Sequence, residues 1–238
     1  MGRDDRTGNL LLDSLDAIER DRLLEGSETK PIGVGHVYLN PGDPIKSVLF
    51  PRSGTLSILA EPSDGRQVEA ATVGREGVAS VHSILGSRKA GQQLIGQVSG
   101  HTISVEIEAF TKEVSNGGRL ELLVHGYIEA MFSQTALGAA CNALHHLNQR
   151  CARWLLMTHD RVDEDTFDLK HEFLAVMLGV RRPSMSVAAN TLASAGLIRY
   201  RRGTITIVDR EGLEEAACPC YEMIRSEYSR LVPLRRAV

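Results

Sequence analysis

Residues 174–213 read LAVMLGVRRPSMSVAANTLASAGLIRYRRGTITIVDREGL, and this stretch decides the fold of the C-terminal part of the chain. From Phe173 to Val208 there is no Asp or Glu but there are five Arg, where the average composition would place between four and five acids. The whole chain carries a formal charge of −3. A polyanion would therefore have to bind a local basic surface and not the bulk of the protein.

The first part of this stretch predicts two helices joined by a tight turn. We expect one helix over residues 170–178, ended by Gly179, which suits the left-handed position after a helix. Pro183 suits the first turn of the second helix, which runs to about Ala195 and stops at Gly196. Helical spacing predicts an inner face of Met185, Ala188, Ala189 and Leu192 and an outer face of Arg181, Arg182, Ser184, Val187, Asn190 and Thr191.

The second part predicts a two-stranded hairpin over residues 197–201 and 204–208, with its turn at Arg202-Gly203. Asp209 then caps the helix that we expect to be the last, through Glu211, Leu213, Ala216 and Ala217. A helix-turn-helix followed by such a wing is typical of DNA-binding regulators, in which the outer N-terminal end of the second helix contacts base edges. The DNA-binding residues predicted from this pattern are Arg181, Arg182, Ser184, Val187, Asn190, Arg199, Arg201 and Arg202.

Residues 30–100 have a different composition, with 11 of the 22 glycines of the chain and short apolar or alternating runs between them. Turn chemistry is strong in Asn40-Pro41-Gly42-Asp43 and in Ser63-Asp64-Gly65. The pattern predicts an antiparallel β-roll or sandwich with strands at 34–39, 47–50, 55–59, 67–72 and 101–107. Before it, residues 14–24 predict a short helix with Leu15, Ile18 and Leu23 on one side.

Residues 119–147 lack proline and repeat apolar residues at helical spacing, which predicts a helix of about 40 Å. This length exceeds what one small domain needs, and Gly138, Ala139 and Ala140 would permit close approach of another helix. We expect a dimerisation helix, with a core helix of a single domain as the alternative. A second helix follows at 148–161, so the expected domains are 1–147 and 148–238. The second carries a net charge of +2 when counted from residue 150, against −5 for residues 1–149.

The four cysteines are Cys141, Cys151, Cys218 and Cys220, and they form no CxxC pair. No Cys/His set has the usual zinc spacing, so we expect buried reduced thiols, no bound metal and no cofactor. A redox or metal sensor using Cys218 and Cys220 is the alternative. Cys141 and His145 would share one helix face, but a solvated histidine is the expected state there, and His82 is expected to be an ordinary loop residue.

Several function classes find no support in the sequence. There is no phosphate-binding GK[ST] loop and no G-x-S-x-G elbow, so we expect no enzyme and no catalytic residues. No run of 18 or more apolar residues occurs, and the first seven residues lack an apolar signal core. We therefore expect a cytoplasmic protein without a membrane partner.

Taken together, the residues quoted above resemble the Crp–Fnr family of bacterial transcription regulators. The stretch 174–213 is similar to the DNA-binding module of that family, and LNPGDPIKSVLFPRSGTLSIL at 39–59 is similar to its cyclic-nucleotide-binding-like β-roll. The resemblance covers about residues 15–215. It implies an α+β chain built from a jelly-roll-like antiparallel β-roll sensor domain, a long dimerisation helix and a C-terminal winged helix-turn-helix.

Two departures concern DNA recognition. The recognition helix of the family usually begins Ser-Arg-Glu-Thr, with a second Arg one turn later; here the run is Arg181-Arg182-Pro183-Ser184, and Val187 holds the second Arg position. The resemblance gives Arg182 the role of binding guanine O6 and N7. Because Pro183 replaces the Glu that would accept from cytosine, the half-site is expected to differ.

The sensor departs further. Family members that bind cyclic nucleotides have Gly-Glu at the pocket rim and Arg-Ser or Arg-Thr beyond it, whereas this chain has Gly77-Val78. Alignment through the next strand puts Gln92-Gln93 at the second position, and an ungapped count puts Arg88-Lys89 there. Without the carboxylate and the bidentate phosphate fork, a cyclic nucleotide is not the expected effector.

The sequence thus predicts a homodimeric regulator that binds a palindromic site in double-stranded DNA and contacts RNA polymerase. The alternatives are a ligand-binding or scaffold protein whose winged domain binds protein, and a thiol-based redox switch. The ligand-binding residues, the effector, the operator, and the choice between activation and repression are not determined by the sequence.

Overall fold

The computed structural model describes residues 6–62 and 65–232. The chain begins with two short helices, α1 (Leu10–Asp13) and α2 (Ala17–Leu24). Asn9 and Asp16 cap them through their side-chain oxygens, and the Asn9 amide also donates to the carbonyls of Pro51 and Gly77, which fixes α1 on the sheet. The predicted inner position of Ile18 is wrong, because its side chain is 71% exposed on the outer side of α2.

An antiparallel sheet follows, as expected, with β1 (Glu28–Ile32), β2 (Val37–Leu39), β3 (Ser47–Ala60), β4 (Val68–Val73) and β5 (Gln93–Glu106). The strand order is β1-β5-β3-β4, and β2 also pairs with β5. The strands predicted at 47–50 and 55–59 are one strand, β3, interrupted by irregular pairing around Gly54. Gly54 has φ +74° and lies so close to the carbonyls of Val98 and Ser99 that a Cβ would clash with both.

The turn at Asn40-Pro41-Gly42-Asp43 is confirmed: the Asp43 amide donates to the Asn40 carbonyl and Gly42 has φ +90°. In the second predicted turn, Ser63 and Asp64 lie outside the described residues. After β4 comes a short 3-10 turn, η1 (Val81–Leu85), and after β5 come α3 (Ile107–Ser115) and the long α4 (Arg119–Leu144).

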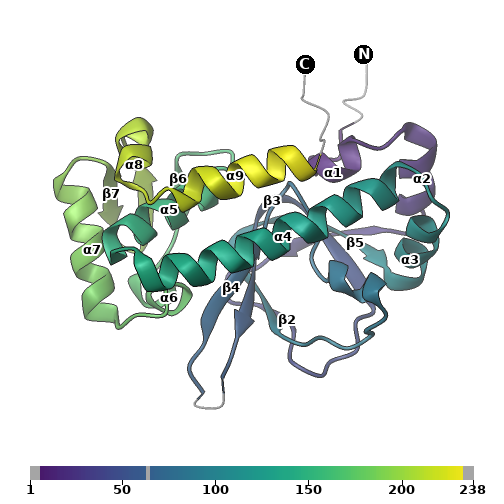
Figure 1. Ribbon diagram of the computed structural model, residues 1–238, viewed down its shortest axis with the longest axis horizontal. Coiled ribbons are helices and arrows are strands. Elements are labelled where there is room, and N and C mark those ends of the chain that lie inside the picture. The colour runs from purple at the N-terminus through teal and green to yellow at the C-terminus, as the bar shows by residue number, and fades with distance from the viewer. Residues whose placement is uncertain (1–5, 63–64, 233–238) are drawn as a thin grey trace.

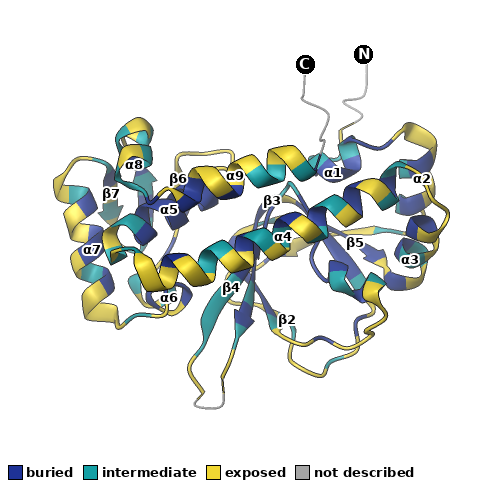
Figure 2. Cartoon of the chain, viewed as in Figure 1, coloured by how far each residue is buried: buried dark blue, intermediate teal, exposed yellow. Residues whose placement is uncertain are grey.

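The long helix α4 crosses the sheet and buries one side against it (Figures 1 and 2). Leu120, Leu123, Val124 and Tyr127 are fully buried there and join Phe50 in the main core. The opposite side of α4 is exposed, with Phe132 at 75%. Helix α4 thus covers the sheet with one side and exposes apolar side chains on the other.

The C-terminal part begins with α5 (Leu147–His159) and contains α6 (His171–Met177), α7 (Arg182–Ser194) and α8 (Arg210–Ala216). Its small sheet joins β6 (Thr166–Asp168), β7 (Ile198–Arg201) and β8 (Thr204–Ile207) in the order β6-β8-β7. The third strand, β6, was not expected, because it follows the acidic run at 160–165.

The last helix, α9 (Cys220–Leu231), was also not expected. It runs back along α4 in the opposite direction: Cys220 lies by His145 near the end of α4, and the Leu231 carbonyl lies at Gly126 near its start. Tyr228 packs 6.0 Å from the Tyr127 ring and donates to Gln134 Oε1 at 3.2 Å. The chain therefore returns from the C-terminal helices to the N-terminal sheet and its long helix α4. Within the described residues no helix is both long enough and apolar enough to cross a lipid bilayer.

Candidate nucleic-acid interface

Helix α7 has the two-sided character that the sequence predicts. Its inner residues Met185, Ala188, Ala189 and Leu192 are buried against α5 and α6. Arg181 is the N-cap residue, and Pro183 lies in the first turn, where no backbone donor is needed. The outer residues are all exposed, namely Arg181, Arg182, Ser184, Val187, Asn190 and Thr191.

Arg182 has a partner that the sequence analysis did not anticipate. Its Nη2 lies 2.8 Å from Glu172 Oε1 on α6, just before the acid-free stretch begins. Both side chains are more than half exposed, so the pair contributes little, typically below about 1 kcal/mol. A base edge or a phosphate can replace Glu172 at small cost.

The wing is held against the helices by His171. Its ring stacks on Tyr200 of β7 with centroids 3.9 Å apart, and its Nδ1 lies 3.1 Å from Ser186 Oγ on α7. Burial lowers the pKa of His171, so the imidazole is neutral at pH 7. The contact fixes the wing relative to α7.

The wing turn carries the remaining predicted residues. Arg202 and Gly203 have φ +51° and +87°, as a two-residue type I′ hairpin requires. Because strand side chains alternate, Arg199 and Arg201 point away from the side on which Tyr200 packs, and both are exposed. The structure therefore places all eight predicted DNA-binding residues in solvent, three on the wing and five on or beside α7.

Gly77 and Val78, which the resemblance places at the rim of a nucleotide pocket, are covered by α4. Tyr127 from α4 lies directly against Gly77, where a Cβ would meet the ring at 2.0 Å, and Val78 is fully buried. Gln93 accepts from Gln67 and donates to Asn40, while Arg88 and Lys89 are exposed. A cavity of about 190 Å³ remains between η1, β3 and α4, lined by Ile58, Ser80, Val81, His82, Ile128, Met131, Phe132 and Thr135. These residues include no Arg or Lys that could hold a phosphate.

Helix α5 joins the two parts of the molecule. Trp154 Nε1 donates to Glu69 on β4 at 2.8 Å, and Gln97 on β5 donates to Thr158 Oγ1 at 3.2 Å. Arg161 beyond the helix forms a 2.7 Å ion pair with Glu76, with both side chains largely buried. The sensor sheet therefore contacts the first helix of the C-terminal domain directly.

All four cysteines are free and buried, as expected, but three of them lie together in a way that the sequence analysis did not anticipate. Cys151 is a buried thiol whose pKa burial raises to about 12. The other three meet His145, so that Cys141, His145, Cys218 and Cys220 present their ligand atoms within 4.8 Å of one another. The sequence shows the two halves of this cluster as a Cys-x3-His pair on a helix and as a Cys-Pro-Cys. Because the two motifs are far apart in the sequence, their meeting could not be predicted.

Comparison with known proteins agrees with this geometry. Residues 149–216 match the family described as the Crp-like helix-turn-helix domain. No curated protein matches the chain. Among solved structures, FixK2 from Bradyrhizobium japonicum shares 13% identity with a TM-score of 0.68, over 81% of this chain and 98% of that one.

Two further structures have the same architecture. One, from Eubacterium rectale ATCC 33656 and assigned to the crp/fnr family of transcriptional regulators, has 17% identity and a TM-score of 0.66, covering 89% of this chain and 99% of that one. The c-di-GMP responsive global regulator CLP from Xanthomonas campestris has 21% identity and a TM-score of 0.62, over 81% and 99% of the two chains.

Together, the comparisons and the geometry identify the kind of C-terminal domain and the fold of the whole chain. The C-terminal domain is a Crp-like helix-turn-helix domain on a chain with the fold of the Crp/Fnr proteins. The Crp-like helix-turn-helix domain supports a DNA-binding transcription regulator, as the sequence suggested, and the solved structures show that the chain shares their fold.

Proposed function

We propose that the chain acts as a homodimer that binds a two-fold symmetric DNA site through α7 and the wing, under the control of the sensor sheet. The observation that carries the proposal is the division of α7 and β7 into a buried apolar side and an exposed side that holds all eight predicted residues.

Each predicted residue has a proposed role. Arg181, Arg182 and Ser184 at the start of α7 would contact base edges in the major groove, with Arg182 binding guanine. Val187 and Asn190 would contact bases further along the helix. Arg199, Arg201 and Arg202 would contact phosphates and supply affinity that falls with salt.

The free side of α4 supports the homodimer. Phe132, Ala136 and Ala139 are exposed at helical spacing, and no described residue outside the adjacent backbone of α4 comes within 4 Å of a Cβ placed on Gly138. Beside them a groove of about 590 Å³ separates α4 from α9, where Met223 is half exposed. A second copy packed here would bring two recognition helices to successive major grooves, about 34 Å apart.

Control would run through α5. Because Glu69, Glu76 and Gln97 of the sensor contact α5 and Arg161, a ligand that moves the sheet would move the C-terminal domain. The cavity at His82 is small and lacks a cationic side chain, which supports an effector other than a cyclic nucleotide. As a bacterial regulator the protein would act in the cytoplasm and contact RNA polymerase.

Selection of bound fragments from random DNA at two salt concentrations tests the proposal. We expect a palindromic site with a reproducible spacing and an affinity that falls steeply with salt. Arg182→Ala should weaken binding by ~1–3 kcal/mol and relax one base position in each half-site. Arg225→Ala on α9 is the control for loss of an exposed arginine.

The outcome that contradicts the proposal is a chain that enriches no sequence, with a weak salt dependence that Arg182→Ala leaves unchanged. That result would favour a winged domain that binds protein.

A further inference from the structure

Four metal-binding side chains meet outside the proposed DNA interface. Cys141 Sγ lies 3.4 Å from Cys218 Sγ, and Cys220 Sγ lies 3.6 Å from His145 Nδ1. All four ligand atoms lie within 4.8 Å of one another. The three cysteines are buried and His145 is partly exposed, so the cluster lies just beneath the surface.

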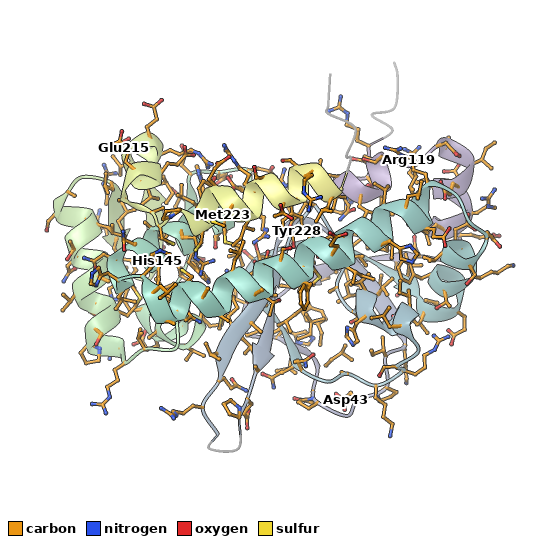
Figure 3. The ribbon with its side chains drawn as sticks, viewed as in Figure 1. Asp43, Arg119, His145, Glu215, Met223 and Tyr228 are labelled. Atoms are coloured by element: carbon orange, nitrogen blue, oxygen red, sulfur yellow. The ribbon has the colours of Figure 1, made fainter. Side chains whose placement is uncertain are left out.

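Two separate elements bring these residues together. Cys141 and His145 lie one turn apart on α4 and its C-cap, so their side chains share a face. Cys218 and Cys220 flank Pro219 where the turn after α8 enters α9. Because α9 runs back along α4, its first turn lies against the end of that helix, at the labelled His145 in Figure 3.

Two of the separations between the ligand atoms are close to those around one tetrahedral ion, and all of them lie within 4.8 Å. Zinc bonds of about 2.3 Å to sulfur and about 2.0–2.1 Å to nitrogen place two sulfurs about 3.8 Å apart and a sulfur and nitrogen about 3.6 Å apart. The measured separations of 3.4 and 3.6 Å are close to these values. An iron–sulfur cluster divides its protein ligands between at least two irons, so some of the four ligand atoms would lie farther apart than the 4.8 Å limit found here.

The side chains beside the cluster are positively charged, whereas a zinc site with three thiolates is negatively charged. Arg150 and Arg153 on α5 are more than nine-tenths buried, and both interact electrostatically with Cys141. Arg153 also interacts electrostatically with Glu69, but among the described residues neither guanidinium forms an ion pair with a carboxylate, and both Nε atoms lack a hydrogen-bond partner. Buried cations need a compensating charge, and three thiolates with one divalent ion and a neutral imidazole carry −1.

We propose that Cys141, His145, Cys218 and Cys220 bind one Zn²⁺ ion, which fastens the start of α9 and the end of α8 to the end of α4. Binding forms three Zn–S bonds and one Zn–N bond and releases the three thiol protons to solvent. With four protein ligands the site is closed and structural. It replaces the expectation from sequence that the chain holds no metal.

The direct test uses the full-length protein, purified under reducing conditions. We expect one equivalent of zinc by elemental analysis and an X-ray absorption spectrum with three sulfurs and one nitrogen around the metal. Replacement by Co²⁺ should give the visible bands of a tetrahedral thiolate site. A chain that binds neither Zn²⁺ nor Co²⁺ stoichiometrically, or that contains a Cys141–Cys218 disulfide instead, would overturn the proposal.

Matched variants locate the site. Cys218→Ser and His145→Ala should each lower zinc affinity by more than tenfold, whereas Cys151→Ala and His125→Ala should retain full zinc content. Cys151 is a buried thiol outside the cluster, and His125 is an exposed histidine on α4 itself. Equal zinc content in all four variants would contradict the assignment; if a ligand variant does not fold, the Co²⁺ spectrum of the unaltered chain decides.

The effect of the metal on DNA binding depends on the proposed function, and its test is separate. If the ion fixes α9 and the C-terminal domain on α4, removal of zinc by a chelator should weaken binding to the selected DNA, and added Zn²⁺ should restore it. If DNA affinity is the same with and without zinc, the zinc site stands but it has no role in regulating DNA binding. Stoichiometric zinc without any DNA binding would instead count against the proposed function.

Discussion

At the scale of single residues, the acid next to the recognition helix has a measurable role. Glu172 forms an ion pair with Arg182, and its charge lies close to where a phosphate would come. Glu172→Gln should therefore raise DNA affinity up to about fivefold at low salt, because exposed pairs contribute about 0.2–1 kcal/mol. Fluorescence anisotropy with the selected site measures this gain.

Glu215→Gln is the control, since it removes the same charge from the far side of α8, where Figure 3 shows Glu215 pointing into solvent. An equal gain in both variants would mean that net charge, and not release of Arg182, raises the affinity.

A substitution in the wing turn should affect stability and DNA binding in different ways. Arg202 has φ +51°, a conformation that Asn adopts more readily, and Asn-Gly is the preferred pair in this turn. Arg202→Asn should keep or slightly raise the unfolding temperature while it lowers DNA affinity. The slope of log affinity against log salt should become shallower by about 0.9 per wing for one lost phosphate contact. An unchanged slope would remove Arg202 from the interface.

At the scale of secondary-structure elements, two glycines of α4 form a natural pair of experiments. A Cβ on Gly126 would lie 2.0 Å from the Leu231 carbonyl, whereas no described residue outside the adjacent backbone of α4 comes within 4 Å of one on Gly138. Gly126→Ala should force α9 off the helix and destabilise the fold by ~1–3 kcal/mol. Gly138→Ala should instead stabilise α4 by up to ~1 kcal/mol through helix propensity. Urea unfolding of both variants distinguishes the two effects, and equal changes would contradict the packing of α9.

The contact between β4 and α5 predicts a pH dependence. Burial raises the pKa of Glu69 to about 7, although Ser57 and Trp154 donate to its carboxylate and lower it. Between about pH 4.5 and 7 the folded chain binds a proton that the unfolded chain has lost, so the stability contributed by this group falls as pH rises through that window. Glu69→Gln, which imitates the protonated acid, should flatten the dependence. Unfolding at pH 5, 6, 7 and 8 measures it, with exposed Glu61→Gln as the control.

The sequence predicted the elements whose signals are local. Gly179 marks the end of α6, Pro183 and Gly196 mark the start and end of α7, and the alternating wing ends at the turn of Arg202 and Gly203. Strand β6 was missed because only pairing with β8 stabilises Thr166–Asp168 after an acidic run. Helix α9 was missed because its burial depends on α4, which lies some 80 residues away in sequence.

In the predicted DNA-binding site, too, local features could be predicted from the sequence and tertiary contacts could not. Exposure of the eight DNA-binding residues follows from helix and strand periodicity, so it was predictable. The pairing of Arg182 with Glu172 and the meeting of Cys141 with Cys218 depend on tertiary packing, which spacing alone does not reveal.

At the scale of the whole molecule, the exposed side of α4 predicts the oligomeric state. Phe132 is 75% exposed beside the α4–α9 groove. Phe132→Glu should convert a dimer into a monomer in sedimentation experiments, because two buried charges would face each other across the two-fold axis. DNA affinity should then fall steeply. Ile18→Glu, at an equally exposed apolar residue on α2, should leave the dimer intact.

The packing of α5 has a consequence for anyone who would build chimeras from this chain. A graft made at the join between α4 and α5 would give Trp154, Thr158 and Arg161 a foreign sheet, with no acids or amides shaped to receive them. A working hybrid would have to transplant β4 and β5 together with α5. The sheet strands β4 and β5 and the helix α5 look separable in the sequence, but they form one packing unit that has to be exchanged as a whole.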